Sequence, residues 1–228
     1  QLPATTIVRI PADTPLRAAL PAAAADLDTD CVWVLTRHTR PEPDALRHLS
    51  LTFGGTRRVL MAGPKLLAAQ PGRLQRFGIQ STRTGRLRLR PRPGEPDQQQ
   101  YDDRLDALAV PIEGALVHRA GLAELGGFDK AFTGVAADLD LGWRGHLAGR
   151  RVALAPRARV VLDEPLPHPT PVRDRRAARR VAITRAPWWA ALFLALWVAL
   201  GAIVAGISLL LIKRPRAAAR ELADVATL

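Results

Sequence analysis

The sequence predicts an α/β domain followed by one transmembrane helix, and two observations lead to this expectation. Over the first 165 residues, short apolar runs that suit buried strands alternate with helical stretches. From Ala186 to Ile212 no residue is charged, and a bilayer core of about 30 Å needs about 20 helical residues to cross it. We therefore expect a folded domain over residues 1–165, a basic linker over residues 166–186 and a transmembrane helix over residues 187–212.

The pattern of apolar residues places the individual elements. The expected helices are Leu16–Ala25, Pro43–Leu51, Ala120–Leu125 and Asp138–Ala148. The expected strands are Thr6–Ile10, Cys31–Leu35, Arg58–Ala62, Leu105–Val110, Ala115–His118, Arg151–Ala155 and Arg159–Leu162. Such alternation favours a largely parallel sheet between helical layers. Residues 70–103 are dense in Pro, Gly, Arg and Gln, which predicts a long irregular loop that is mobile without a ligand.

The net charge of +12 is concentrated beside the apolar run. Basic residues on both of its flanks suit an anionic lipid surface and favour a cytoplasmic folded domain in a cell-membrane protein. Other arginines in the Pro/Gly-rich stretch lack interleaved aromatic residues for base stacking, so nucleic acid is not an expected partner. We expect residues 213–228 to form an amphipathic tail. The flanking residues are Arg173, Arg175, Arg176, Arg179, Arg180 and Arg185 before the run, and Lys213, Arg214, Arg216 and Arg220 after it.

Five short motifs follow one another along the folded domain. They are residues 63–65 (Gly-Pro-Lys), 94–98 (Gly-Glu-Pro-Asp-Gln), 113–119 (Glu-Gly-Ala-Leu-Val-His-Arg), 125–129 (Leu-Gly-Gly-Phe-Asp) and 138–144 (Asp-Leu-Asp-Leu-Gly-Trp-Arg). In this order and spacing, over about residues 4–220, the chain resembles family 2 glycosyltransferases. It looks closest to the large bacterial membrane-bound members of that family.

This resemblance implies a GT-A fold with a mixed sheet, truncated at the N-terminus because the chain begins at Gln1 in what reads as mid-domain. It implies transfer of a sugar from a nucleotide-sugar to a glycan or lipid-linked acceptor during cell-envelope glycan assembly. Expected partners then also include membrane lipids and other membrane proteins of envelope assembly. Asp138 falls where the family places its general base, which deprotonates the acceptor hydroxyl. The other residues that the resemblance places against substrates are Arg37, His38, Gly63, Lys65, Gly114, Asp140, Trp143 and Arg144.

The expected metal site departs from the family pattern. Members usually carry acidic residues after the strand that corresponds to Cys31–Leu35, and these carboxylates hold Mg²⁺ or Mn²⁺ against the donor diphosphate. Here that place reads Thr36-Arg37-His38, and a histidine that often completes the site is replaced by Leu162, next to Asp163. We therefore expect no metal cofactor and an impaired metal-dependent transfer.

Several candidate residues have a structural interpretation beside the functional one. Asp138 opens an apolar-periodic run, so it can be a helix N-cap as well as a base, and the acidic neighbour that commonly precedes it is Ala137. Asp140 and Arg144 stand at i,i+4, where an ion pair on the helix surface is expected. Trp143 can pack in the core or stack on a sugar. His38, His118 and His146 share no metal-ligand spacing and are interpreted as solvated or locally bonded.

Three functional hypotheses remain open from the sequence. The first is a glycosyltransferase-like membrane protein with impaired catalysis, which serves as a scaffold in envelope-glycan assembly. The second is an active, metal-independent transferase in which the guanidinium of Arg37 grips the diphosphate directly. The third is a module that binds anionic surfaces and has no sugar chemistry.

Overall fold

The computed structural model describes residues 6–54, 58–82, 87–89, 91–166, 171–211 and 219. The chain divides into two units. The first consists of Gln1–Gln80 with Arg88–His168, and the second of Ser81–Leu87 with Pro169–Leu228.

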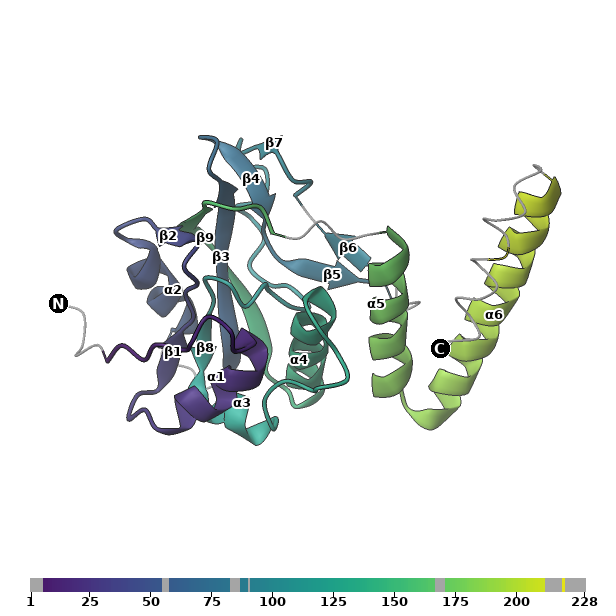
Figure 1. Cartoon of the computed structure of the whole chain (residues 1–228), viewed down its shortest axis with the longest axis horizontal. Coiled ribbons are helices and arrows are strands. Elements are labelled where there is room, and N and C mark those ends of the chain that lie inside the picture. The colour runs from purple at the N-terminus through teal and green to yellow at the C-terminus, as the bar shows by residue number, and fades with distance from the viewer. Residues whose placement is uncertain are drawn as a thin grey trace. The chain divides into compact units, whose positions relative to one another are not determined.

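A mixed sheet with β3 (Val59–Ala68) at its centre builds the first unit (Figure 1). β9 (Arg151–Leu162) runs parallel to β3 along its length. β8 (Leu116–His118) pairs with the first half of β3, and β4 (Arg73–Arg76) pairs with its second half. The outer strands β1 (Cys31–Trp33), β7 (Glu95–Pro96) and β2 (Thr39–Pro41) pair with β8, β4 and β9, respectively.

The expectation of a largely parallel sheet is wrong, whereas a mixed sheet is observed. In the described part of this sheet, β3 and β9 are the parallel pair, and the remaining pairs are antiparallel. β8 shows why alternation with helices does not fix strand direction. The residues that lead into it, 97–115, form no helix, and an antiparallel strand does not need the crossover helix that a parallel strand requires.

The expectations of a strand at residues 6–10 and of one irregular loop over residues 70–103 are also wrong. Residues 6–10 form no strand, and Ile7 is 79% exposed. Residues 70–103 are not one irregular loop, since they contain β4, β7, β5 (Ile79–Ser81) and β6 (Leu87–Leu89), with β5 and β6 forming a two-stranded sheet. Leu74 and Ile79 are fully buried and anchor this stretch. Residues 105–110 make only isolated bridges in the described structure, at Asp106 and Ala109.

Helices cover both faces of the sheet, because alternate residues of the central strands point to opposite sides. On β9, Val152 and Leu154 belong to one core, while Ala153 and Ala155 belong to another. The first core also contains residues of α1 (Leu16–Ala25), α3 (Arg119–Glu124) and α4 (Val135–Leu147). The second is closed by Leu49 and Phe53 of α2 (Ala45–Phe53). The strands are therefore buried on both sides, and candidate site residues lie at their ends.

β3 and β9 are both longer than the sequence suggests. The expected end of the strand at Ala62 is wrong, because β3 continues through Gly63 and Pro64 to Ala68. β9 is continuous where two strands were expected, with an irregularity in its pairing: Pro64 faces Ala155, whereas the next residue, Lys65, faces Arg159. This irregularity brings Lys65 and Arg159 side by side.

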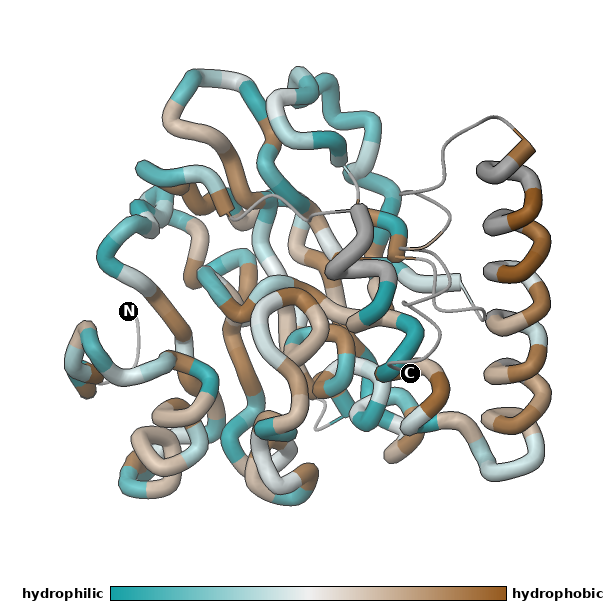
Figure 2. The backbone as a smooth tube through the Cα atoms, turned by 45° about the vertical axis from the view of Figure 1, so that its right-hand side comes forward, coloured by the Kyte–Doolittle hydropathy of each residue, from teal (hydrophilic) through white to brown (hydrophobic). Residues whose placement is uncertain are grey.

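The second unit contains α5 (Pro171–Arg185) and α6 (Trp188–Leu211). The expected basic linker is thus largely helical, and α6 coincides with the apolar run, whose described residues are mostly brown in Figure 2. Trp188 and Trp189 are exposed. Within the described part of the chain, no helix is both long and apolar enough to cross a membrane. The transmembrane span stays a prediction, and the expected tail 213–228 lies outside the described residues except for residue 219.

Candidate functional site

A tight turn at residues 36–39 lies where the resemblance places the metal-binding carboxylates. Val34, just past β1, donates to the carbonyl of Ala115 at 2.9 Å and accepts from the amide of Gly114 at 2.8 Å. The chain then turns, and the Thr39 hydroxyl closes this turn. Its Oγ1 accepts from the Thr36 amide at 2.8 Å and donates to the Thr36 carbonyl at 2.7 Å. The end of β1 and the segment around Gly114 therefore lie side by side.

The segment around Leu162, where the resemblance places a histidine ligand, lies against this turn. Thr39 of β2 faces Leu162 of β9, and the amide of Asp163 donates to the carbonyl of His38 at 2.9 Å. The 36–38 segment and Leu162, the two places where the resemblance puts metal ligands, are therefore neighbours in space. We call residues 36–39 with 162–164 the basic corner.

The polar groups of the basic corner are engaged with one another. Arg37 is exposed, and its Nε donates to Nε2 of His38 at 2.7 Å. The other ring nitrogen of His38, Nδ1, lies 3.4 Å from Oε1 of Glu164. Asp163 pairs with Arg40 at 2.6 Å. Both imidazole nitrogens and the nearest carboxylates thus already have partners.

This donor set does not fit a hard divalent cation. Mg²⁺ and Mn²⁺ need several oxygen ligands, and a neighbouring guanidinium repels them. Among the residues that the structure describes, no group of three or more His, Cys, Asp or Glu side chains could hold a metal ion. No chemical step is therefore assigned to a metal at the basic corner.

Asp138, the candidate base, lies in the first turn of α4 and is 2% exposed. The N-cap interpretation of this residue is wrong, because α4 begins at Val135 and its N-cap is Gly134. Helix periodicity starts three residues earlier than the apolar pattern suggested. Asp138 is therefore a residue of the first helical turn and not the cap. A carboxylate buried to this extent needs hydrogen-bond partners.

Arg17 of α1 supplies those partners. Its Nε donates to Oδ1 of Asp138 at 2.8 Å, and its Nη2 donates to Oδ2 at 2.8 Å. Nη2 also lies 3.1 Å from Oε1 of Glu113, one residue before the segment that contacts the end of β1. We call Arg17, Glu113 and Asp138 the carboxylate cluster. Two negative side chains share one guanidinium there.

Burial raises the pKa of Asp138, because the charged form loses its hydration. The charge and hydrogen bonds of Arg17 act in the opposite direction, the negative charge of Glu113 raises the pKa again, and a backbone hydrogen bond from Ile112 lowers it. The result is a pKa of about 6. A carboxylate with such a pKa is closer to the operating range of a general base than an ordinary aspartate.

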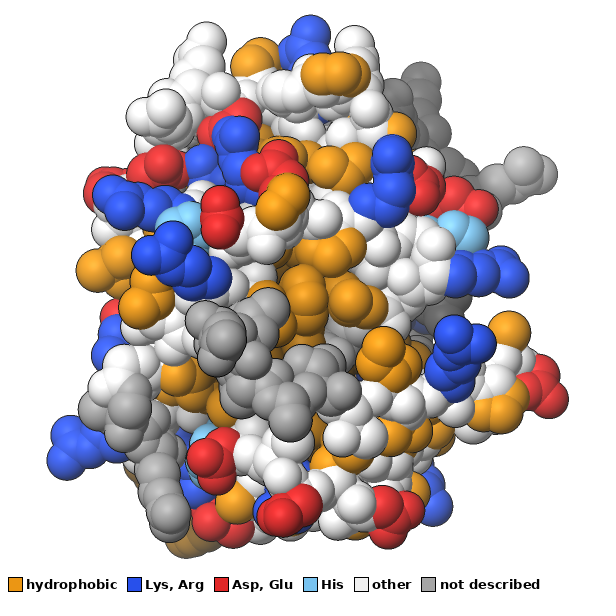
Figure 3. All heavy atoms as spheres, turned by 90° about the vertical axis from the view of Figure 1, so that its left-hand side faces the viewer, with side chains coloured by type: hydrophobic (Ala, Val, Ile, Leu, Met, Phe, Trp, Pro, Cys, Tyr) orange, Lys and Arg blue, Asp and Glu red, His pale blue; other side chains and the backbone are white. Residues whose placement is uncertain are grey.

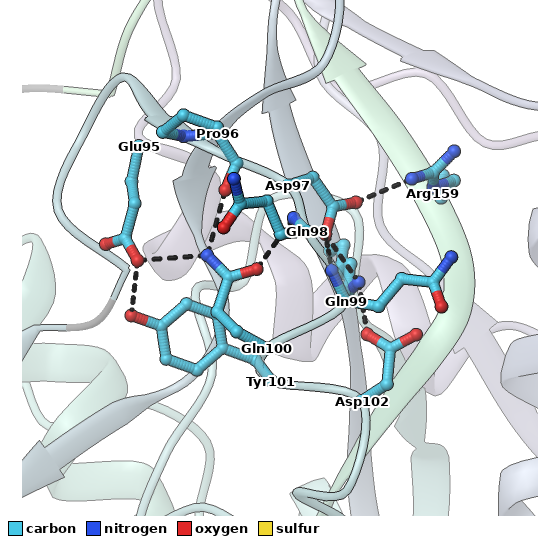
Figure 4. A network of polar contacts seen from close by, with 10 residues as sticks. Glu95, Pro96, Asp97, Gln98, Gln99, Gln100, Tyr101, Asp102 and Arg159 are labelled. Atoms are coloured by element: carbon cyan, nitrogen blue, oxygen red, sulfur yellow. Dashed lines mark hydrogen bonds and ion pairs between the residues drawn. The ribbon is translucent and has the colours of Figure 1, made fainter.

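Lys65, another candidate substrate-binding residue, is 1% exposed and does not face solvent. Its Nζ donates to Oδ1 of Asp97 at 2.9 Å and pairs with Asp102 (Figure 4). Arg159 donates to the other oxygen of Asp97 at 2.5 Å. Burial alone would raise the pKa of Asp97, but the hydrogen bonds from Lys65 and Arg159 outweigh it and hold that pKa below its usual value. This network ties the 94–103 segment to the sheet.

The two candidate glycines allow close packing. Gly63 is buried in β3, and a Cβ there would lie 2.5 Å from Cγ1 of Val110. Gly114 has φ +83°, a backbone conformation that side chains disfavour, and a Cβ there would lie 3.1 Å from Pro64. Its carbonyl accepts from the indole Nε1 of Trp33 at 3.0 Å. Gly114 therefore shapes the segment between the basic corner and the carboxylate cluster.

The last three candidates belong to α4. Arg144 pairs with Asp140 at 2.8 Å, as the i,i+4 spacing predicts, but the expected place of this pair on the helix surface is wrong, because Asp140 is fully buried. The Arg144 guanidinium also donates to the carbonyls of Leu125 and Gly127 at 2.6 and 2.7 Å, which anchors the Gly-Gly-Phe-Asp segment. Trp143 is half-buried, so its role as a packing or stacking residue stays open.

Sequence reasoning gave no role to Arg17, Glu113, Asp97, Asp102 or Arg159. Arg17 is the only charged residue of an Ala-rich helix, and that isolation is the one signal that could have drawn attention to it. Asp97 and Glu113 stand in two of the five motifs, but no local pattern at these two residues, or at Asp102 and Arg159, predicts the partners that they contact. Of the remaining histidines, Nδ1 of His118 accepts from the Gly121 amide and Nε2 of His146 lies 3.0 Å from the Ala107 carbonyl, so both are locally bonded.

Seen from the side that Figure 3 presents, hydrophobic side chains gather in a hollow near the middle of the face, and charged side chains of both signs border it. Leu35, which leads into the basic corner, is 41% exposed. An apolar floor with polar groups at its rim is a common arrangement in small-molecule sites.

Comparison with solved structures identifies the fold. No family model and no curated protein sequence matches this chain. A crystal structure of GalNAc-T7 with UDP, GalNAc and Mn²⁺ is similar to it, with a TM-score of 0.51, 14% sequence identity and coverage of 71% of this chain. The chain has a GT-A-like glycosyltransferase fold. It spans about a third (34%) of the length of that solved structure, and an identity this low shows the GT-A-like fold alone. Membership of family 2 stays a prediction.

Proposed function

We propose that this chain is a glycosyltransferase-like protein that binds a nucleotide-sugar and in which metal-dependent sugar transfer is impaired. The GT-A-like fold supports sugar-nucleotide chemistry, since the similar GalNAc-T7 structure contains UDP and GalNAc. The observation that carries the proposal is the basic corner. Arg37 and His38 stand there beside Leu162, and none of the three can supply a carboxylate oxygen to a hard cation.

A second candidate function is metal-independent transfer. The Arg37 side chain is exposed, and among the described residues its guanidinium makes one hydrogen bond, from Nε to Nε2 of His38. A guanidinium can bind two phosphate oxygens at once and neutralise a leaving diphosphate in place of a metal. In this candidate Asp138 remains the general base.

Titration calorimetry on the full chain with UDP, UDP-glucose and UDP-GalNAc, in EDTA and then in Mn²⁺, tests the proposal. Binding that Mn²⁺ does not strengthen is the expected result. Sugar transfer in EDTA would favour the second candidate. Failure of all three nucleotides to bind, together with tight binding of polyanions such as heparin, would contradict both and support a module for anionic surfaces.

We also propose that the chain belongs to family 2, is anchored in the cell membrane through residues 187–212 with its folded domain in the cytoplasm, and acts in cell-envelope glycan assembly. The order of the motifs and the basic flanks of the apolar run support this proposal. A Ser81→Cys chain that also carries Cys31→Ala tests the orientation. Labelling of the introduced thiol by an impermeant maleimide is expected only after the cells are opened, and efficient labelling of intact cells would contradict the proposed orientation.

A further inference from the structure

The carboxylate cluster raises a question of access. A general base must accept a hydrogen bond from the hydroxyl that it deprotonates. Both oxygens of Asp138 instead accept hydrogen bonds from Arg17, and the side chain is 2% exposed. In this arrangement an acceptor hydroxyl that approaches Asp138 from the side of α1 must displace Arg17.

The surroundings of Asp138 leave Arg17 as its counter-charge. Arg17 approaches from α1, Glu113 from the segment before β8, and Ile112 contributes a backbone hydrogen bond. On α4 itself, the nearest acidic group, Asp140, is paired with Arg144. Among the described residues, Arg17 is therefore the one cation that contacts the Asp138 carboxylate.

The cluster is open to solvent on the side of Arg17 and Glu113. Their side chains are 21% and 17% exposed, against 2% for Asp138. Glu113 already accepts from Nη2 of Arg17 at 3.1 Å, so the guanidinium has a second carboxylate onto which it can move. Release of Asp138 would therefore not leave the charge of Arg17 unpaired.

We propose that Arg17 is a positioning residue that controls Asp138. Its two hydrogen bonds keep the carboxylate inaccessible to an acceptor hydroxyl, and transfer requires the guanidinium to shift onto Glu113. This inference rests on the second candidate function, metal-independent transfer with Asp138 as the general base. This control is separate from the basic corner, because blocked access to Asp138 would limit transfer whether or not a metal is bound.

Carboxyl labelling of the full chain with a carbodiimide and glycine ethyl ester, read by mass spectrometry, tests this directly. In the wild type, Asp138 should be protected. In Arg17→Gln it should label about tenfold faster. This factor corresponds to a loss of about 1.4 kcal/mol in the stability of the arrangement in which Arg17 covers Asp138. Arg17→Lys keeps the charge but can reach only one oxygen well, so intermediate protection is expected.

A matched control is Arg151→Gln, which breaks an exposed ion pair with Asp106 and should leave Asp138 protected. Circular dichroism melts identify any variant that fails to fold, and Arg17→Lys then decides the question alone. Equal protection of Asp138 in folded Arg17→Gln, Arg17→Lys and wild type would overturn the proposal, because burial by other groups would then hide the carboxylate.

Transfer, where it is detected, gives a second readout. Removal of the guanidinium raises the pKa of a carboxyl group that it had stabilised in the charged form. The rise of the transfer rate with pH, expected near pH 6 in the wild type, should therefore move to higher pH in Arg17→Gln. An unchanged midpoint would contradict control by Arg17. Absence of transfer in every variant would count against an active enzyme, while the labelling result would still decide the arrangement of Asp138.

Discussion

Thr39 and Leu162 are register partners on the antiparallel strands β2 and β9. This pairing brings together two segments that lie more than 120 residues apart, and both carry replacements of expected metal ligands. Because the Thr39 hydroxyl also closes the 36–39 turn, the position of Arg37 and His38 depends on it. The strand pairing and the Thr39 hydroxyl therefore position the residues of the basic corner.

Replacing Thr39 with Val should destabilise the protein by about 1–2 kcal/mol. The two side chains have similar shapes, so the loss comes from the hydrogen bonds that Oγ1 makes to the amide and carbonyl of Thr36. Urea denaturation followed by circular dichroism measures the change in the free energy of unfolding.

Thr52→Val is the matched control for this substitution. The Thr52 hydroxyl donates only to the carbonyl of His48 within α2, which already takes part in helix hydrogen bonding. This variant should change the free energy of unfolding by less than about 0.5 kcal/mol. Equal effects of the two substitutions would show that Thr39 does not hold the turn.

The elements that local pattern specifies were predictable, and the contacts between distant charges were not. Leu16–Ala25 is helical over the expected residues, because its apolar periodicity is a local property. Arg17 and Asp138 are 121 residues apart, and nothing in the local sequence of either residue links it to the other. Only the packing of α1 near α4 makes them partners, so a sequence pattern could nominate Asp138 but not the group that holds it.

The Lys65 network is a second contact that the local sequence could not predict. Lys65 was expected to contact substrate because the resemblance places it there, and the strand before it was expected to end at Ala62. β3 instead continues past Gly63 and Pro64, and the continuation buries the ammonium group against Asp97 and Asp102. Strand length depends on the partner strand β9, which the local sequence of β3 does not reveal.

Lys65→Met should cost about 3–5 kcal/mol of stability, because it removes one of the two counter-charges of the buried Asp97 carboxylate. Arg151→Met is the control, since the Arg151–Asp106 pair is about half exposed and should contribute less than about 1 kcal/mol. Thermal and urea denaturation of both variants compare the two losses. A loss for Lys65→Met no larger than that for Arg151→Met would mean that the network does not anchor the 94–103 segment.

Acidification should weaken this network. The pKa of Asp97 is lower in the folded protein than its ordinary value of 3.8, so the folded state binds fewer protons than the unfolded state below about pH 5. The contribution of Asp97 is complete above about pH 5 and is lost as the pH falls through 3.8 toward the folded pKa. Asp97→Asn should flatten the decline of unfolding free energy between about pH 5 and 3, and a decline as steep as in the wild type would contradict this assignment.

The most direct test of the basic corner is the Mn²⁺ dependence of UDP binding, measured by calorimetry on the full wild-type chain and on Arg37→Asp/His38→Asp/Leu162→His. The triple variant places two carboxylates and an imidazole at positions that the β2–β9 pairing brings together, which is a ligand set that Mn²⁺ accepts. We predict that Mn²⁺ leaves UDP binding to the wild type unchanged and strengthens UDP binding to the triple variant. Micromolar Mn²⁺-dependent UDP binding by the wild type, or no effect of Mn²⁺ on a folded triple variant, would contradict the assignment of this corner as a lost metal site.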